Sequence, residues 1–552
     1  MTFHFSRQGL SGRDRFWERA LEIAPGATSW TILLGISALA FRDPLLAAVV
    51  IIAFDLYWLF RLLYMTFFLV LSYVRLSVER DTDWMACLQE IEGTAVLRVP
   101  AARHRIAQWI MRRNLEALSR AQSRDGAPPP SAREIIHLVI IPIANEPSSV
   151  YEPGIRSLIG QQFPARQILV VLAVEARAPA GVHAEAEAAR QRFRSHFLDF
   201  LIIRHPDGVP GEARVKGANA TCAAKAAAAY LMARGIAVAR VVVSCFDADT
   251  VVNPAYVACL TAHFMLCPHR ARASFQPIPV YHNNIWEVPG FARVLDVGAS
   301  FFQLIEATNT ATLVTFSSHS MSFQALVEAG YWPVDMISDD SAIFWKALIH
   351  YDGDYRVVPM SVTVSMDVAA AGSWRKTVLN VYRQKRRWAW GVENFPIVMR
   401  AFLCAKGIPL RRRIAHAFKL FGGHVAWATW PFLIGVVGWL PALVAGREFS
   451  SSVVYYSAPR IAAIIFRLAS VSLLTTVVLS ACLLPKAPAR FPWLRKAGHV
   501  VEWCLVPVVV IVLSAIPALD AQTRLMTGHY LEFWVTEKRR GGIMKHAQMT
   551  PA

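Results

Sequence analysis

The sequence predicts an α/β domain with a mostly parallel, Rossmann-like sheet, combined with an α-helical transmembrane region. Two observations lead to this class. Long apolar runs lie near both ends of the chain, between residues 29 and 74 and between residues 420 and 519. Between them, short apolar runs without polar alternation are separated by helical stretches, as in strands buried on both faces of a parallel sheet.

The composition points to a membrane protein. The chain has 552 residues, of which 55% are hydrophobic and only 17% are charged, and its mean hydropathy is +0.36. These values exclude a disordered, fibrous or simple soluble protein. The net charge of +18 is grouped beside apolar stretches, which indicates orientation charge and attraction to anionic lipid. We therefore expect membrane lipid, and no nucleic acid, as a partner.

The N-terminal apolar region is divided by a short polar break. Four arginines precede the run Ser29 to Phe41, and after Arg42-Asp43-Pro44 a longer run extends from Leu45 to about Val74. These runs predict two spans or one tight hairpin.

Three further apolar runs follow near the C-terminus, at Leu420 to Ala445, Ile461 to Leu484 and Val500 to Leu519. Each is long enough to cross about 30 Å of hydrocarbon. They predict about three C-terminal spans.

The distribution of basic residues predicts the orientation. The N-terminal arginines and Arg411-Arg412-Arg413 favour the cytoplasmic side, so we expect a multi-pass protein of the inner (plasma) membrane with everything from about Val78 to Arg413 in the cytoplasm. The basic loop Lys486 to Lys496 also favours the inside. A third C-terminal span would then export a tail that is itself basic, so either that crossing occurs or one apolar run is re-entrant or interfacial.

The expected strands follow one another at regular spacing. They are Ile135 to Ile143, Ile168 to Val174, Phe200 to Ile203 and Val241 to Phe246, with a charged helix at Ala184 to Arg194 before the third of them. Ligands of parallel sheets bind beyond the carboxyl ends of the strands, so we expect the chemistry there.

Polar residues stand at these ends. Asn145 and Glu146 follow the first strand, and Asp247 and Asp249 follow the fourth. Two carboxylates at positions i and i+2 can project toward one divalent cation, although such triplets also occur in turns and helix caps.

Two later segments also carry candidate chemistry. Asp339 and Asp340 precede the helical run Ala342 to His350, where they serve either catalysis or the positive end of a helix. Gln384-Lys385-Arg386-Arg387-Trp388 lies in a basic stretch that suits an amphipathic helix on anionic lipid. His319, in a polar loop, is interpreted as a hydrogen-bonded structural residue.

Taken in order, these residues resemble the membrane-integrated family 2 glycosyltransferases with the GT-A fold, the branch that includes cellulose, chitin and hyaluronan synthases. Asn145-Glu146 takes the place of the first-strand element, Lys216-Gly217 that of a Lys-Gly element, and Asp247 and Asp249 match the DxD motif. Gln384, Arg387 and Trp388 match QxxRW, and residues 533 to 538 match FxVTxK. Glu175 stands where the family usually has an Asp pair that reads the nucleotide base.

The resemblance implies a nucleotide-sugar-dependent hexosyltransferase that inverts the anomeric carbon and uses Mg²⁺ or Mn²⁺. Asp340 is then the catalytic base, Asp249 and Asp247 hold the metal, and Trp388 and Asp339 contact the acceptor. The implied donor-binding residues are Asn145, Glu146, Glu175, Lys216, Asp247, Gln384 and Arg387. The implied gating residues are Phe533, Val535, Thr536 and Lys538. Lys216 also fits a solvated residue at a helix start, and Trp388 a membrane-interface anchor.

Three functions are weighed. The first is a processive synthase that moves sugars from a nucleotide diphosphate sugar, preferentially a UDP-sugar, to a growing polysaccharide and exports the glycan. The second is a single-sugar transferase that acts on a lipid acceptor. The third is a transporter or scaffold with an inactive transferase domain. It is disfavoured because one chain retains Asn145, Lys216, Asp247, Asp249, Asp340, Gln384, Arg387 and Trp388.

The expected organisation has six parts along the chain: an N-terminal membrane region (1–78), a helical connector and linker (79–133), a GT-A catalytic domain (134–372), an amphipathic interface segment with QxxRW (373–413), C-terminal spans (414–520) and a tail with FxVTxK (521–552).

Overall fold

The computed structural model describes residues 3–92, 130–405, 407–444, 453–486, 498 and 501–538. Most of the predicted linker from Ala121 to Arg133, most of the loop from Lys486 to Lys496 and the basic residues after Lys538 lie outside the described residues.

The central element is a mixed sheet of eight strands in the order β3-β2-β1-β4-β7-β6-β8-β5. Neighbours β3, β2, β1 and β4 are parallel, as are β6 and β8, whereas β7 is antiparallel to both of its neighbours and β5 to β8. The strands are β1 (Ile136–Ile143), β2 (Ile168–Glu175), β3 (Asp199–His205), β4 (Val241–Cys245), β5 (Val251–Val252), β6 (Ala273–Val280), β7 (Ser320–Ser322) and β8 (Arg356–Ser365). The predicted mostly parallel α/β sheet is confirmed.

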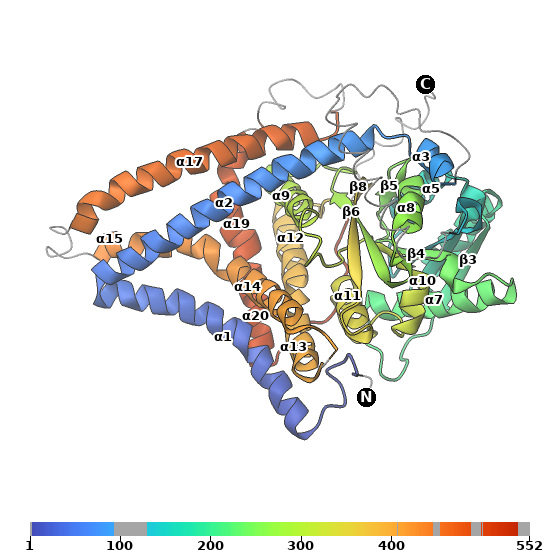
Figure 1. Ribbon diagram of the computed structural model, residues 1–552, viewed down its shortest axis with the longest axis horizontal. Helices are drawn as coiled ribbons and strands as arrows, with labels where there is room; N and C mark the ends of the chain where they lie inside the picture. Colours follow the sequence, from blue (N-terminus) through green and yellow to red (C-terminus); the bar gives the residue numbers. More distant parts are fainter. Residues whose placement is uncertain are drawn as a thin grey trace.

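Helices cover both faces of this sheet (Figure 1). The helices of this part of the chain are α5 (Ser148–Ile159), α6 (Ala180–Phe193), α7 (Lys216–Ala233), α8 (Tyr256–Leu266), α9 (Gly290–Glu306), α10 (Phe323–Glu328), α11 (Asp339–His350), α12 (Trp374–Ala389) and α13 (Asn394–Cys404).

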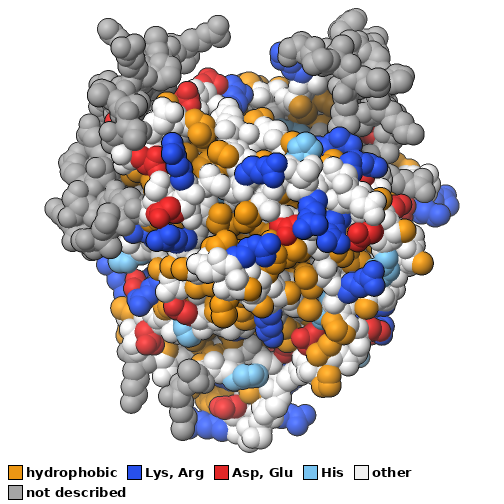
Figure 2. Space-filling model, turned by 90° about the vertical axis from the view of Figure 1, so that its right-hand side faces the viewer, with side chains coloured by type: hydrophobic (Ala, Val, Ile, Leu, Met, Phe, Trp, Pro, Cys, Tyr) orange, Lys and Arg blue, Asp and Glu red, His pale blue; other side chains and the backbone are white. Residues whose placement is uncertain are grey.

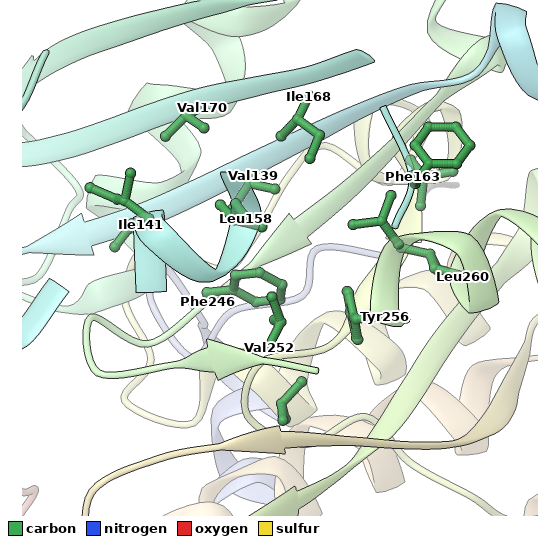
Figure 3. Close-up of a cluster of buried hydrophobic side chains, with 14 of the residues drawn as sticks. Val139, Ile141, Leu158, Phe163, Ile168, Val170, Phe246, Val252, Tyr256 and Leu260 are labelled. Carbon is green, nitrogen blue, oxygen red and sulfur yellow. The ribbon is translucent and has the colours of Figure 1, made fainter. Parts of the chain in front are cut away.

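Alternate residues of the central strands enter two separate cores. Val139 and Ile141 of β1 pack with Val170 of β2 and with side chains of α5 and α8 (Figure 3). Leu138 and Ile140 point to the other face and pack against α7 and α11. Because both faces are buried, these strands read as unbroken apolar runs in the sequence.

The long apolar helices extend away from the sheet (Figure 1). They are α1 (Gly12–Arg42), α2 (Pro44–Arg80), the bent pair α14 (Leu410–Gly435) and α15 (Leu440–Val444), α17 (Val453–Leu483), and a final helical stretch of η8 (Trp503–Leu505), α19 (Val506–Val510), η9 (Ile511–Ala515) and α20 (Ile516–Thr527). The short helix α3 (Trp84–Ile91) follows α2. By length and composition, four of these helices can cross a membrane, or five if the bent pair is one span. This suggests membrane association.

The break between α1 and α2 has a local cause. Pro44 occupies the first turn of α2, and the residue before a proline is disfavoured in helical conformation. Asp43 is accordingly non-helical, and its side chain accepts a hydrogen bond from the backbone N–H of Leu46 at 3.0 Å. The polar break in the sequence is therefore a cap between two long helices.

The end of the molecule opposite the long helices has a different surface. Figure 2 shows basic and acidic side chains interspersed over this face, with hydrophobic side chains between them. By contrast, α2 exposes large apolar side chains along its length, such as Phe60, which is 69% exposed, and Phe67, which is 64% exposed. This contrast fits a water-facing domain joined to helices that face lipid.

Candidate functional site

Lys216, the first residue of α7, is the centre of a charged cluster at the carboxyl edge of the sheet. Its Nζ lies 2.9 Å from Asp247 Oδ1, 2.9 Å from each carboxylate oxygen of Asp340, and 3.8 Å from Asp339 Oδ2. Burial alone would lower the pKa of Lys216, but these three carboxylates raise it well above its ordinary value. Lys216 is thus a buried ammonium within the site and not a solvated surface lysine.

Asp339 and Asp340 both belong to the first turn of α11, but their surroundings differ. Ser338 takes the N-cap position, so neither acid caps the helix. The side chain of Asp340 is 23% exposed, whereas that of Asp339 is 4% exposed. Burial, together with the nearby charges of Asp340 and Asp247, raises the pKa of Asp339 to about 8. Asp340 is therefore the member of the pair that a ligand can reach.

Asp247 follows β4 and is held by several donors. Ser317 Oγ donates to Asp247 Oδ2, and Ser318 Oγ accepts from the Asp247 backbone N–H at 3.3 Å. Burial would raise the pKa of Asp247, but Lys216 and Lys538 hold it below its ordinary value. Asp247 is therefore an ionised carboxylate.

Asp249 is completely buried and uses its two carboxylate oxygens differently. Oδ2 accepts a hydrogen bond from the backbone N–H of Asp367 at 2.7 Å, and Oδ1 lies 2.5 Å from Lys538 Nζ. Asn283 Nδ2 donates to the Asp249 backbone carbonyl at 2.8 Å, which fixes the loop. The DxD segment thus presents one oxygen of Asp249 to a cation, and that cation is an ammonium here.

The C-terminal segment brings Lys538 into the site along α12. The Asn380 side chain makes two hydrogen bonds with the Glu537 backbone. Its Nδ2 donates to the Glu537 carbonyl oxygen at 2.8 Å, and its Oδ1 accepts from the Glu537 N–H at 3.3 Å. The Arg387 guanidinium lies 5.2 Å from the centroid of the Phe533 ring, and its Nη2 is 3.5 Å from Thr536 Oγ1. Segments that match QxxRW, FxVTxK and DxD therefore meet at one place.

The other two residues of the QxxRW motif, Gln384 and Trp388, also lie on α12. Gln384 is buried, and its Oε1 has no hydrogen-bond partner among the described residues. Trp388 is partly buried, with its ring centroid 6.0 Å from that of Tyr281 and 5.9 Å from that of Phe316. Its indole is therefore part of an aromatic cluster within the protein, and one member of that cluster, Phe316, directly precedes Ser317.

Asn145 and Glu146 follow β1 and Glu175 ends β2, so they lie at the same sheet edge, but they make separate contacts. Glu146 Oε2 accepts from the backbone N–H groups of Ala144 and Asn145, at 2.8 and 3.0 Å, and Asn145 is exposed. Glu175 is buried, 3.2 Å from His205 Nδ1 and 3.6 Å from Arg177 Nε. Glu146 therefore shapes the turn after β1, whereas Glu175 is in contact with His205 and Arg177.

Sequence reasoning missed several members of this site. Ser317 and Ser318 stand beside the strand β7, which pairs with β4 and so brings them to Asp247. His205 Nδ1 lies 3.2 Å from Glu175 Oε2, and its Nε2 lies 2.8 Å from Glu212 Oε2. The polar run at residues 317 to 320 was the available signal for the serines. His319 Nδ1 lies 3.0 Å from the Phe316 carbonyl oxygen, consistent with the structural interpretation.

Comparisons with known proteins place this site in context. Residues 242–483, from β4 to α17, match the sequence model described as "Glycosyl transferase family group 2". No curated protein matches the chain.

Solved structures with partial likeness include a mannosyltransferase and the protein TarS. A mannosyltransferase from Pyrobaculum calidifontis, in complex with GDP-Man and Mn²⁺, is 16% identical with a TM-score of 0.39, over 71% of this chain and 94% of its own. TarS 1-349 from S. aureus, in complex with UDP, is 11% identical with a TM-score of 0.34, over 73% and 95%. TM-scores this low do not establish a common overall fold. The match over residues 242–483 supports a family 2 glycosyltransferase, an enzyme that depends on a nucleotide sugar as its donor.

Proposed function

We propose that this protein is an inverting membrane glycosyltransferase that moves a sugar from a nucleotide diphosphate sugar, preferentially a UDP-sugar, to a growing polysaccharide. The observation that carries the proposal is the meeting of Asp247, Asp249, Lys216, Asp340 and Arg387 with the C-terminal segment at the carboxyl edge of the sheet. Such an edge is where open α/β sheets bind ligands. The match to a glycosyl transferase family over residues 242–483 supports the same chemistry.

Asp340 is the proposed catalytic base. Transfer with inversion requires a carboxylate that accepts the proton of the acceptor hydroxyl as the oxygen attacks the anomeric carbon. Asp340 is the more exposed of the two acids on α11, and its Oδ1 lies 2.9 Å from Lys216 Nζ. Asp339 is buried behind it, so its proposed contribution to acceptor binding is indirect.

The DxD carboxylates fit a divalent cation. Asp249 Oδ1 already faces a cationic group, Lys538 Nζ, at 2.5 Å, and Asp247 is ionised. The described residues contain no group of three or more His, Cys, Asp or Glu side chains suited to a metal, so water and the donor diphosphate would supply the remaining ligands. When bound, Mg²⁺ or Mn²⁺ stabilises the charge of the departing diphosphate.

Arg387 and Lys538 are the proposed cationic partners of the diphosphate. The forked guanidinium of Arg387 suits phosphate oxygens, and its only described polar side-chain contact is the long one to Thr536, at 3.5 Å. Gln384 offers an unused buried oxygen nearby on α12. Asn145, Glu146 and Glu175 are proposed for the nucleoside side of the donor.

The segment from Phe533 to Lys538 is the proposed gate. It is anchored by Asn380 at one end, and its Lys538 occupies the cation-facing oxygen of Asp249. Binding of a metal and donor therefore requires Lys538 to leave Asp249, with Thr536, Val535 and Phe533 moving in the same segment. This motion would couple donor binding to the position of the C-terminal segment.

The remaining parts of the proposal concern location. We propose that the chain has the six parts expected from the sequence. We also propose that it is a multi-pass protein of the inner (plasma) membrane with a cytoplasmic catalytic domain. The long apolar helices support membrane association, and Trp388 on the amphipathic helix α12 is the proposed contact for a glycan acceptor. Export of the polymer would follow through the spans.

A panel of nucleotide sugars tests this function. Purified protein in detergent is incubated with each donor, nucleotide release is measured, and product mass is then determined. The proposal expects release from one donor and a ladder of product lengths. A product carrying one added sugar on lipid would replace it by the single-sugar alternative, and no release from any donor would favour the transporter or scaffold alternative.

A further inference from the structure

A buried ion pair joins α9 to α12 beside Trp388, the tryptophan of the QxxRW motif. Lys385 Nζ lies 2.6 Å from Asp296 Oδ1, and the two side chains are only 4% and 3% exposed. Burial raises the pKa of Asp296 and lowers that of Lys385, so each group depends on the other for its charge. A buried ion pair of this kind rarely adds net stability, because both charges lose their hydration. The Lys385–Asp296 pair therefore calls for an explanation other than stability.

The ammonium of Lys385 also covers the indole of Trp388. Nζ lies 3.7 Å from the centroid of that ring, well within the range of a cation–π interaction. The two residues are three positions apart on α12, which places them on neighbouring parts of one helix face. Asp296 therefore fixes the ammonium, and the ammonium fixes the plane of the indole.

The same indole contacts the loop that holds the DxD carboxylate. Its ring meets Phe316 at 5.9 Å and 82°, and Phe316 precedes Ser317, whose hydroxyl donates to Asp247. Tyr281, which follows β6, meets the indole at 6.0 Å, and its buried hydroxyl has no hydrogen-bond partner among the described residues. A shift of the indole would thus displace Phe316 and, through it, Ser317 beside Asp247.

We propose that Asp296 and Lys385 are positioning residues for the acceptor: Asp296 holds the Lys385 ammonium against Trp388 and so sets the aromatic surface on which the acceptor sugar stacks. The inference rests on the proposed function. The QxxRW pattern leaves the position of Lys385 unspecified, so this pair is a property of this chain's own sequence. It predicts an effect on acceptor use that exceeds the effect on donor hydrolysis.

The test compares transfer with hydrolysis in single and double variants. The probe is a trisaccharide of the sugar that the wild-type protein transfers, and the readouts are its KM, donor hydrolysis in its absence, and the thermal unfolding midpoint. We expect Lys385→Met to raise the trisaccharide KM about 30-fold, the scale of a desolvated cation–π contact, and to change donor hydrolysis far less. Lys385→Arg, which keeps the charge, should restore part of the loss.

A double variant separates positioning from stability. Asp296→Asn alone leaves Lys385 as an uncompensated buried charge and is expected to lower the unfolding midpoint. Asp296→Asn/Lys385→Met removes both charges and should recover the midpoint, but its trisaccharide KM should remain raised. Recovery of both the midpoint and KM would reduce the pair to a structural role and overturn the inference.

A neighbouring ion pair on the same helix serves as the matched control. Arg386 Nη1 pairs with Asp520 Oδ2 at 2.9 Å, at the partly exposed side of α12. Arg386→Met should leave the ratio of transfer to hydrolysis unchanged, and an equal shift in that ratio would contradict the specific role of Lys385. If the wild-type protein releases nucleotide from no donor, the proposed function itself fails, which is distinguishable from active variants with an unchanged KM.

Discussion

Replacement of Lys538 by Met should strengthen binding of a divalent cation in the absence of donor. Lys538 Nζ lies 2.5 Å from Asp249 Oδ1, and the Asp249 side chain is fully buried, so a cation that binds this oxygen must first displace the ammonium. A hydrogen bond to a charged group contributes about 1.5–3 kcal/mol. At about 1.4 kcal/mol per tenfold change, removal of this competitor should lower the Kd for Mn²⁺ by about 10- to 100-fold.

The assay is a titration of purified protein with Mn²⁺, followed by the paramagnetic signal of the free ion, at fixed pH and without nucleotide sugar. Lys538→Met should also lower the thermal unfolding midpoint in EDTA, because Asp249 then lacks its buried counter-charge, and Mn²⁺ should restore it. Lys376→Met, at an exposed lysine on α12, is the matched control. Equal or weaker Mn²⁺ binding by Lys538→Met would refute the competition between lysine and metal.

Three further predictions concern metal, pH and topology. Asp249→Ala should abolish nucleotide release without unfolding the protein, and EDTA should do the same to the wild type; turnover that persists in chelator would remove the metal from the mechanism. Burial raises the pKa of Asp339 to about 8 in the folded protein, so the folded state binds more protons than the unfolded state between the ordinary aspartate pKa and that value. Stability should consequently fall as pH rises toward 8, and Asp339→Asn should flatten this fall in thermal unfolding curves, whereas an unchanged slope would contradict the assignment. Met232 is 76% exposed at the far side of α7, and Met232→Cys, in a variant without the exposed cysteines 404, 482 and 504, should react with a membrane-impermeant maleimide only after cells are permeabilised. Labelling in intact cells would reverse the proposed topology.

The first half of the sheet was predictable because its strands are buried on both faces. The run before Asn145, for example, became β1, and the run before Asp247 became β4. Strand β6 was not predicted, because Pro277 and Pro279 interrupt it and prolines cannot donate to the sheet. Strands β5 and β7 are only two and three residues long, too short to leave a periodic signal.

The residues that converge in the candidate site carried a signal in the sequence, but their contacts with one another did not. The parallel arrangement made the approach of Lys216, Asp247 and Asp340 foreseeable, since elements that begin or end at one sheet edge converge there. The contact between Lys538 and Asp249 depends on the path of the whole C-terminal segment along α12, which no local pattern encodes. The pairing of Asp296 with Lys385 likewise depends on how α9 packs against α12, so neither residue carried a signal of its own.

The proposed chemistry depends on Asp340 as the base, and its amide variant tests this most directly. Asp340→Asn keeps the size of the side chain and removes the carboxylate that faces Lys216 at 2.9 Å. Nucleotide release and sugar transfer are measured for this variant and the wild type with the same donor and metal, together with donor affinity. The account predicts turnover reduced by about 100-fold or more, the scale of general-base catalysis, with donor binding retained. Transfer by Asp340→Asn at the wild-type rate would contradict it.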